Sequence, residues 1–299
     1  MQKEQFEESG DKLIVNAPAK INLYLMIAGK RPDGYHNIDT LMSKITWYDQ
    51  VIIEPSDNEG VELACTGSYW APQNDDNLII KAVKALNDDC GFNESIRITL
   101  QKNIPAGTGL GSASSDAAAT LLGLNKYFSL GISKQRLAKI AAKFGSDTAF
   151  FTGNSLAVCK GRGEILHELE TDINYQALLI IPNISMPTVE VYRNYSHDEE
   201  IYYNSAHKIN PLMSSNNVLE AASLGINMLA ESCFDINGKM SEIYREADDV
   251  LGGGVVLSGS GSAFYKILSD ENTQEIDELM RSLKDRLGCN IILVSNNRW

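Results

Sequence analysis

Glycines and serines crowd one stretch of the chain, residues 104–117, in a pattern that suits phosphate binding. The stretch reads Ile-Pro-Ala-Gly-Thr-Gly-Leu-Gly-Ser-Ala-Ser-Ser-Asp-Ala. Its three glycines allow positive φ angles and a close approach of the backbone to a ligand. The serines follow where the first free N–H groups of a helix would lie, and such a helix start attracts anions. We therefore expect a phosphate cradle that leads into a helix.

Three further groups of residues could do chemistry. Lys20 and Asn22 share one face of a predicted strand at 17–25, because strand side chains alternate. Most such pairs simply face solvent. A Pro-Asp-Gly turn presents Tyr35 and His36, a pair that usually serves packing. Asp147 follows Gly145-Ser146, where most aspartates cap a helix or close a turn.

Three known kinds of glycine-rich loop can be compared with this one. The P-loop carries a lysine after its last glycine, and here that position is Ser112. The dinucleotide fingerprint needs a third glycine and a second parallel strand, whereas a second predicted helix follows the first. The loop of protein kinases lies between two strands, whereas this one opens a helix. A structural loop without a ligand would need neither three glycines nor the serines after them.

Composition limits the class of protein. The chain has 299 residues and a formal net charge of −13, which argues against a general binder of nucleic acid or of membrane surfaces. The five cysteines are scattered and lack metal-ligand spacing, as is typical of free cytosolic thiols. No apolar run approaches membrane-spanning length, and the polar first 11 residues do not resemble a targeting peptide. We expect a cytoplasmic enzyme or binding protein.

Periodicity predicts the elements that would position these residues. Strands are expected at 12–16, 17–25, 38–44, 50–54, 95–101, 155–159, 177–181, 255–257, 263–268 and 290–294. Helices are expected at 77–87, after the glycine loop, and at 134–144, 218–230, 239–251 and 273–287. Residues 1–11 are expected to be a frayed tail, 183–192 a loop, and 196–216 irregular. This order indicates a mixed α+β protein in two parts that join near residues 165–175.

Residues 105–118 resemble the phosphate loop of the GHMP small-molecule kinases, and four other blocks narrow the resemblance. The blocks are Ala-Pro-Ala-Lys-Ile-Asn-Leu (17–23), Arg-Pro-Asp-Gly-Tyr-His (31–36), Phe-Gly-Ser-Asp-Thr-Ala-Phe-Phe (144–151) and Leu-Ser-Gly-Ser-Gly-Ser-Ala (257–263). Together they are similar to the branch that phosphorylates a cytidine diphosphate-linked methylerythritol with ATP. The resemblance implies a two-domain α+β GHMP kinase fold. Residues 1–170 would form a ribosomal S5 domain 2-like domain, and 171–299 a ferredoxin-like domain that completes the substrate site.

The resemblance also implies roles for individual residues. Asp147 would accept the proton of the substrate hydroxyl, and Lys20 would keep Asp147 ionised and polarise that hydroxyl. Asn22 would bind the erythritol or phosphate part of the substrate, Tyr35, His36 and Tyr192 the cytosine, and Thr188 would also lie on the substrate side. The residues implied for ATP are Asn77, Lys102, Pro105, Gly107, Gly109, Leu110, Gly111, Ser112, Ser114 and Ser115. Mg²⁺ would bridge phosphate oxygens, and no protein ligand for it is assigned.

The chain departs from the usual pattern of this branch at two places. Ser112 and Ala113 stand where two further glycines are usual, so the loop is closer to the general superfamily form. Ser146 and Thr148 flank the aspartate where small apolar residues are more usual. No catalytic group is lost by either change.

Other interpretations remain at this point. The chain could be another GHMP kinase that acts on mevalonate, homoserine or a sugar, although Tyr35, His36 and Tyr192 would then have no base to stack on. It could be a nucleotide or metabolite binder, which would not need both Lys20 and Asp147. A dinucleotide-dependent oxidoreductase fits the predicted topology least. The expected partner is a small molecule, and the expected assembly is a monomer or a weak homodimer.

Overall fold

The computed structural model describes residues 1–269 and 271–299. Its elements run β1 (Phe6–Ser9), β2 (Lys12–Lys30), β3 (His36–Pro55), β4 (Val61–Gly67), α1 (Leu78–Cys90), β5 (Ile96–Lys102), α2 (Ser112–Tyr127), α3 (Lys134–Ala141), α4 (Thr148–Phe151), β6 (Leu156–Gly161) and β7 (Ile165–Glu168). They continue with β8 (Gln176–Ile181), α5 (Thr188–Asn194), α6 (Glu199–Ser214), α7 (Val218–Ser223), α8 (Ala230–Ile236), α9 (Gly238–Val250), β9 (Val256–Leu257), β10 (Phe264–Ile267), α10 (Thr273–Leu287) and β11 (Asn290–Ser295).

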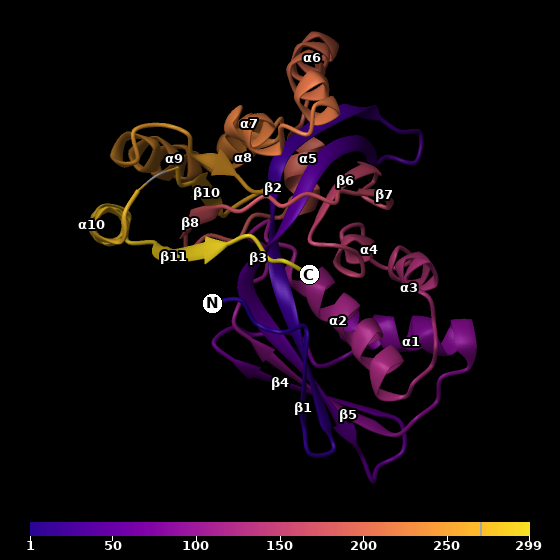
Figure 1. Ribbon diagram of the computed structural model, residues 1–299. Helices are drawn as coiled ribbons and strands as arrows, with labels where there is room; N and C mark the ends of the chain where they lie inside the picture. Colours follow the sequence, from indigo (N-terminus) through magenta and orange to yellow (C-terminus); the bar gives the residue numbers. More distant parts are fainter. Residues whose placement is uncertain (270) are drawn as a thin grey trace.

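The long β2–β3 hairpin is the central element of the molecule and runs through both of its halves (Figure 1). Its first strand holds both predicted strands, 12–16 and 17–25, in one element, with register shifts at three places. The far half of β3 pairs with β5, and the half near the hairpin turn pairs with β6. The hairpin lies at the centre of a seven-stranded sheet. Five of the strands have the order β1-β2-β3-β5-β4, β6 pairs with β3, and β7 pairs with β6.

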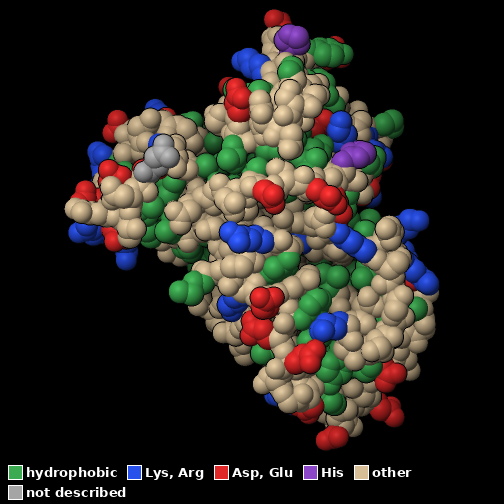
Figure 2. Space-filling model, in the orientation of Figure 1, with side chains coloured by type: hydrophobic (Ala, Val, Ile, Leu, Met, Phe, Trp, Pro, Cys, Tyr) green, Lys and Arg blue, Asp and Glu red, His purple; other side chains and the backbone are tan. Residues whose placement is uncertain are grey.

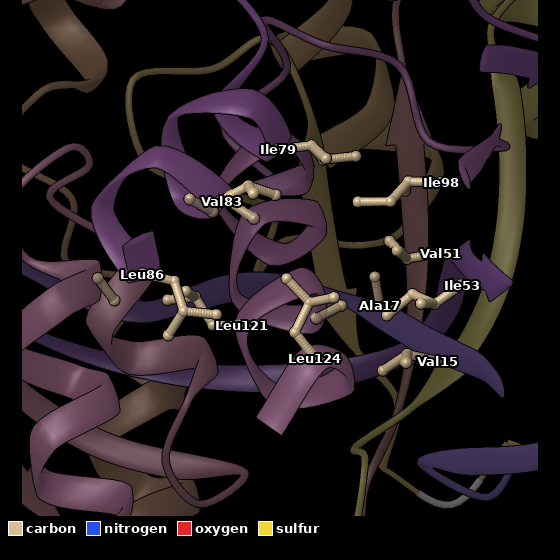
Figure 3. Close-up of a cluster of buried hydrophobic side chains, with 14 of the residues drawn as sticks. Val15, Ala17, Val51, Ile53, Ile79, Val83, Leu86, Ile98, Leu121 and Leu124 are labelled. Carbon is tan, nitrogen blue, oxygen red and sulfur yellow. The ribbon is translucent and has the colours of Figure 1, made fainter. Parts of the chain in front are cut away.

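Helices α1 and α2 cover one face of this sheet (Figures 1 and 3). Leu124 of α2 points toward Val15 of β2 and Ile53 of β3, Leu121 lies beside Leu86 of α1, and α1 adds Ile79 and further apolar side chains. Burial of these side chains stabilises the layer by about 25 cal/mol per Å² of apolar surface. The helix that carries the glycine loop at its start is therefore firmly seated on the sheet.

A second sheet forms the other half, in the order β11-β8-β10-β9. Along the chain, β8 is followed by five helices (α5 to α9), then by β9, β10, α10 and β11. With the five helices counted as one crossover, this is the β-α-β-β-α-β order of ferredoxin-like folds. One hydrophobic cluster contains side chains of both halves, Ile21 and Leu23 from β2 together with Leu179 and Tyr265 from the second sheet. A boundary at residues 170/171 falls between the two sheets and remains a prediction as a domain boundary.

Several predictions about local structure were wrong. Residues 6–9 form β1, because they pair with Lys12–Val15 of β2, and so are no frayed tail. Within the irregular segment predicted at 196–216 lies the 16-residue helix α6, which the Asp198 side chain caps by accepting from two backbone N–H groups. The last part of the predicted loop 183–192 is the start of α5. The predicted helix 218–230 is interrupted after Ser223, so that α7 and α8 are separate.

The surface carries acidic and basic side chains interspersed over the face shown in Figure 2. Helix α6 projects from the rest of the molecule beyond the hairpin (Figure 1). Within residues 1–269 and 271–299, none of the helices has the length and apolar character needed to cross a bilayer.

Candidate active site

A cavity of about 580 Å³ lies where the two halves meet. The glycine loop, the inner part of β2 and the hairpin turn line it from the first half. Helix α5 and the turn after β9 line it from the second half. Thirteen of the predicted site residues face it: Lys20, Asn22, Tyr35, His36, Pro105, Gly107, Gly109, Gly111, Ser112, Ser114, Asp147, Thr188 and Tyr192.

Hydrogen bonds from other parts of the protein to the carbonyl groups of the loop hold the loop in place. The carbonyl of Gly107 accepts from Met186 N (3.0 Å), that of Thr108 from Ala263 N (3.0 Å), and that of Leu110 from Lys20 N (2.9 Å). The Ser258 hydroxyl donates to the carbonyl of Gly109 (3.1 Å). With these carbonyls engaged, the N–H groups at the start of α2 are left for an anion in the cavity.

At two positions of the loop, glycine is required both by a positive φ angle and because there is no room for a Cβ atom. Gly109 has φ +74°, and a Cβ there would stand 2.0 Å from the Ser258 carbonyl oxygen. Gly111 has φ +70°, and a Cβ there would stand 2.9 Å from the Phe151 ring and 3.0 Å from Cγ of Lys20. Ser112, which replaces a glycine of the usual pattern, begins α2 and needs no positive φ. The departure at Ser112 is therefore compatible with this loop geometry.

Lys20, Asn22 and Asp147 form one polar group at the floor of the cavity. Lys20 Nζ lies 3.5 Å from Asp147 Oδ2 and donates to Asn22 Oδ1 at 2.6 Å. Asn22 Nδ2 in turn donates to the Thr40 hydroxyl at 2.9 Å. Lys20 and Asn22 are 3 % and 2 % exposed, so this strand face is buried and not solvated. Their alternation on β2 predicted the shared face correctly, and the glycine loop and the turn at Gly259 cover it.

Aromatic side chains also line the cavity, from the hairpin turn and from α5. The His36 and Tyr192 rings lie 5.5 Å apart and tilted by 33°, and Tyr195 meets His36 edge-on at 5.8 Å. Burial, and after it the charge of Lys30, lowers the pKa of His36, which favours the neutral form of its ring. Tyr35 is half exposed, and the Arg162 guanidinium lies over its ring at 5.1 Å. Thr188 Oγ1 and Ser260 Oγ are 2.9 Å apart at the side of this pocket. Flat rings around a neutral imidazole suit a single heterocyclic base.

Four predicted ATP residues do not line the cavity: Asn77, Lys102, Leu110 and Ser115. Asn77 is the N-cap of α1, where its side chain accepts from Ile79 N. Leu110 is buried in the core, and only its carbonyl supports the site, through Lys20 N. Ser115 is buried in the first turn of α2 with a hydroxyl that lacks a partner within the described residues. Their roles toward ATP remain predictions.

Lys102 lies in a buried ion group beneath the loop. Its Nζ contacts Asp49 and lies 2.7 Å from Asp116 Oδ2. Burial opposes the charge on Lys102, but the attraction of Asp116 and Asp49 outweighs it and raises the lysine pKa. Burial raises the pKa of Asp116 well above its usual range, although Lys102 opposes this shift. Since Asp49 also accepts from Ile104 N at 2.8 Å, the group fastens the strand end before the loop to the start of α2.

Sequence reasoning missed several residues that line the cavity: Lys30, Arg162, Arg193, Gly259 and Ser260. A signal existed for two segments, since Gly259 and Ser260 belong to the serine-glycine block 257–263, and Arg162 stands between Gly161 and Gly163. Gly161 and Gly163 have φ +72° and +122°, and a Cβ on Gly163 would stand 3.0 Å from the Ser146 carbonyl oxygen. Arg193 had no such signal, because its place depends on helix α5.

The side chains that line the cavity suit a metal ion that is bound mainly by the phosphates of the substrates and not by the protein. In the described part of the chain, no three His, Cys, Asp or Glu side chains cluster in a way that could bind one. The cavity offers the Asp147 carboxylate and the hydroxyls of Ser112 and Ser114 beside the loop. Mg²⁺ usually keeps few protein ligands and binds through substrate phosphates, so this set fits it.

Comparison with known proteins agrees with this geometry. The family model described as "GHMP kinases N terminal domain" matches residues 77–154, which include the glycine loop and Asp147. The 4-diphosphocytidyl-2-C-methyl-D-erythritol kinase of Chloroherpeton thalassium is 36% identical over 86% of this chain and 90% of its own. The enzyme of that name from a Geobacillus species is 32% identical over 92% of this chain and 95% of its own. The chain belongs to this kinase family.

Solved structures agree with the family assignment. A crystal structure of 4-(cytidine 5'-diphospho)-2C-methyl-D-erythritol kinase matches with a TM-score of 0.74 and 28% identity, over 96% of this chain and 100% of that one. The L. major mevalonate kinase in complex with R-mevalonate matches with the same TM-score, at 14% identity, over 100% and 99% of the two chains. The second likeness concerns the fold alone. A GHMP kinase fold, as the sequence predicted, is confirmed.

Proposed function

We propose that the protein transfers the γ-phosphoryl group of ATP to the 2-hydroxyl of 4-(cytidine 5'-diphospho)-2-C-methyl-D-erythritol, a step of the non-mevalonate route to isoprenoid precursors. One observation carries this proposal. The Lys20–Asp147 pair, a loop suited to phosphates and several aromatic rings line one and the same cavity. A kinase for a nucleotide-linked alcohol needs these three parts in one site.

The residues suggest a division of labour. Asp147 accepts the proton of the hydroxyl while the hydroxyl oxygen attacks the γ-phosphorus, and ADP leaves with the electrons of the broken P–O bond. Lys20 orients Asp147 and stabilises negative charge that develops on the attacking oxygen. Asn22, held by Lys20 and Thr40, binds the erythritol part. Alignment of the two substrates in a cavity that excludes most water supplies much of the rate.

The two ends of the cavity hold the two substrates. The loop N–H groups and the hydroxyls of Ser112 and Ser114 bind the ATP phosphates. Tyr192 and His36 stack with the cytosine, and Tyr35 covers it from the hairpin turn. Bound Mg²⁺ would neutralise charge on the phosphate oxygens. We further propose that the enzyme works in the cytoplasm with free thiols, as a monomer or weak homodimer.

Turnover of different acceptors tests the proposal. Purified protein is incubated with Mg-ATP and, separately, with the cytidine diphosphate-linked methylerythritol, mevalonate or homoserine, and ADP release is followed. We expect turnover of the first acceptor alone. Turnover of mevalonate or homoserine without the cytidine compound would assign the protein to another branch. That outcome is disfavoured by the neighbouring His36 and Tyr192 rings, for which those substrates offer no base.

A further inference from the structure

Lys44 is a fully buried lysine on β3 that the proposed reaction does not use. It is 0 % exposed, and no carboxylate within 4 Å pairs with it in the described part of the chain. Its Nζ donates to the carbonyls of Gly153 (2.8 Å) and Phe151 (3.3 Å). Its backbone N–H donates to the Ser155 carbonyl at 2.8 Å. Since burying an amine is costly without hydrogen bonds, these carbonyls determine where its side chain lies.

The two carbonyls that Lys44 binds lie at the C-terminal end of α4, the short helix that follows Asp147. Helix α4 comprises only Thr148–Phe151, and Asp147 is its N-cap residue. A single turn is unstable by itself, because helix nucleation is unfavourable and the last carbonyls lack partners within the helix. Lysine at a helix C-terminus supplies such partners. The placement of α4, and of Asp147 with it, therefore depends on groups outside the helix.

The same helix contacts the phosphate loop and the catalytic lysine. The Phe151 ring lies so close to Gly111 that a Cβ there would stand 2.9 Å from it, and Cγ of Lys20 would be 3.0 Å from the same point. Helix α4 is thus wedged between Lys44 at its end and the Gly111–Lys20 contact on its side. A shift of the end of α4 would change the distance between Asp147 and Lys20.

The C-terminal residues seal Lys44 from water. The Asn297 N–H donates to the Lys44 carbonyl at 2.8 Å, and Asn296 bridges to Ile45. The Trp299 ring lies 5.7 Å from Lys44 Nζ, stacks on Tyr48 at 6.0 Å, and donates through Nε1 to the Lys3 carbonyl. Hydrogen bonds in such a water-poor site are electrostatically stronger than exposed ones. The end of the chain thereby protects the contact between Lys44 and α4.

We propose that Lys44, sealed beneath Trp299, is a positioning residue for Asp147: it fastens the end of α4 so that the Asp147 carboxylate faces Lys20. The inference rests on the proposed role of Asp147 as the base. Nothing in it requires Lys44 to touch either substrate. By this proposal the C-terminal residues, which lie outside the cavity lining, support catalysis because they keep Lys44 in place.

The test compares Lys44→Met, Lys44→Gln and Trp299→Ala with the unaltered enzyme. Methionine keeps the volume and loses the donor, whereas glutamine keeps an N–H donor on a shorter stem. We expect kcat to fall about 10- to 100-fold in Lys44→Met, as for a small misplacement of a catalytic group. KM for both substrates should stay within about twofold, and the acidic limb of the pH–kcat profile should move. Lys44→Gln should recover part of kcat, and Trp299→Ala should lose activity in the same direction.

Ile53→Ala, on the same strand but against α1 and α2, is the matched control for lost stability. It should melt at a lower temperature and keep kcat. Amide hydrogen exchange of Thr152 and Gly153, which donate within the turn of α4, supplies a readout that needs no turnover. Exchange should be faster in Lys44→Met and unchanged in the control.

The outcomes separate this inference from the proposed function. If the unaltered protein phosphorylates the cytidine compound but Lys44→Met keeps its kcat, the inference is wrong and the function stands. Unchanged exchange at Thr152 and Gly153 in Lys44→Met would also overturn the inference, with or without turnover. If the cytidine compound is not a substrate at all, the proposed function fails, and exchange alone then decides whether Lys44 fastens α4.

Discussion

Lys20 Nζ and Asp147 Oδ2 lie 3.5 Å apart, and their side chains differ in exposure, at 4% and 27%. The lysine is enclosed by β2, the glycine loop and Asn22, whereas the carboxylate reaches the cavity. The hydroxyl of a substrate can therefore reach the Asp147 carboxylate while Lys20 contacts that carboxylate from its buried side. This asymmetry supports the proposed roles of Asp147 as the base and of Lys20 as the supporting charge.

Asp147→Asn should lower kcat by about 10²- to 10⁴-fold, since a general base contributes on that scale. The amide keeps the shape of the side chain, so KM for both substrates should change little. Steady-state kinetics with each substrate varied in turn measure both quantities. Near-normal kcat would show that Asp147 is not the base.

Lys20→Met should lower kcat by about 10²-fold or more, because charge on the attacking oxygen loses its stabilising partner. The loss of the 2.6 Å contact should also free the Asn22 side chain and raise KM for the acceptor. ATP affinity, measured by titration calorimetry, should stay close to its original value. A variant with weak ATP binding and normal kcat would place Lys20 on the nucleotide side instead.

Gly109→Ala should destabilise the protein and weaken ATP binding. The substitution adds strain at φ +74° of about 1–2 kcal/mol. The new Cβ would also collide with the Ser258 backbone. Gly91→Ala is the matched control, since Gly91 has φ +71° with nothing within 4 Å of its Cβ position. Urea unfolding and the KM for ATP compare the two. Equal effects in both variants would mean that the loop does not need this close approach.

Tyr192→Ala should raise KM for the cytidine compound and leave KM for ATP unchanged. Loss of base stacking costs about 1–3 kcal/mol, or roughly five- to 150-fold in affinity. Tyr192→Phe keeps the ring and should bind the acceptor normally. If ATP binding fell as well, Tyr192 would not be specific to the base pocket.

The free energy of unfolding should rise with pH above about 7, in part because of Lys44. Burial lowers the pKa of Lys44 to about 7, Lys134 from α3 lowers it further, and Glu168 from β7 opposes this. Between about pH 7 and 10 the unfolded chain therefore holds a proton on Lys44 that the folded chain lacks. That difference adds stability with increasing pH, by up to about 1.4 kcal/mol per pH unit.

Urea unfolding of the unaltered protein and of Lys44→Met at pH 7, 8 and 9 isolates this contribution. The other titrating groups are common to both proteins, so the difference between the two slopes belongs to Lys44. We expect a shallower rise with pH in the variant. Parallel curves would show that Lys44 keeps its proton in the folded protein.

The sequence alone determined the local features of this protein. The loop, the helix after it and the turn at 31–36 depend on glycine, proline and serine, whose preferences act within a few residues. Helix α10 lies at 273–287 as predicted, and in the structure a capping box and a final glycine mark its ends. The family resemblance came from such local blocks, and most of the site residues that it named line the cavity.

Only the tertiary structure decided which residues meet and which are buried. The alternation of Lys20 and Asn22 is the same for a solvated and a covered strand, and the glycine loop and the turn at Gly259 make it covered. The family resemblance placed Lys102 on the nucleotide side, which stays a prediction, and only the structure shows that two carboxylates from β3 and α2 surround it. Arg162, Arg193 and Lys44 take their places from elements far away in the sequence. Contacts of this kind follow from packing of the whole chain, which no local pattern encodes.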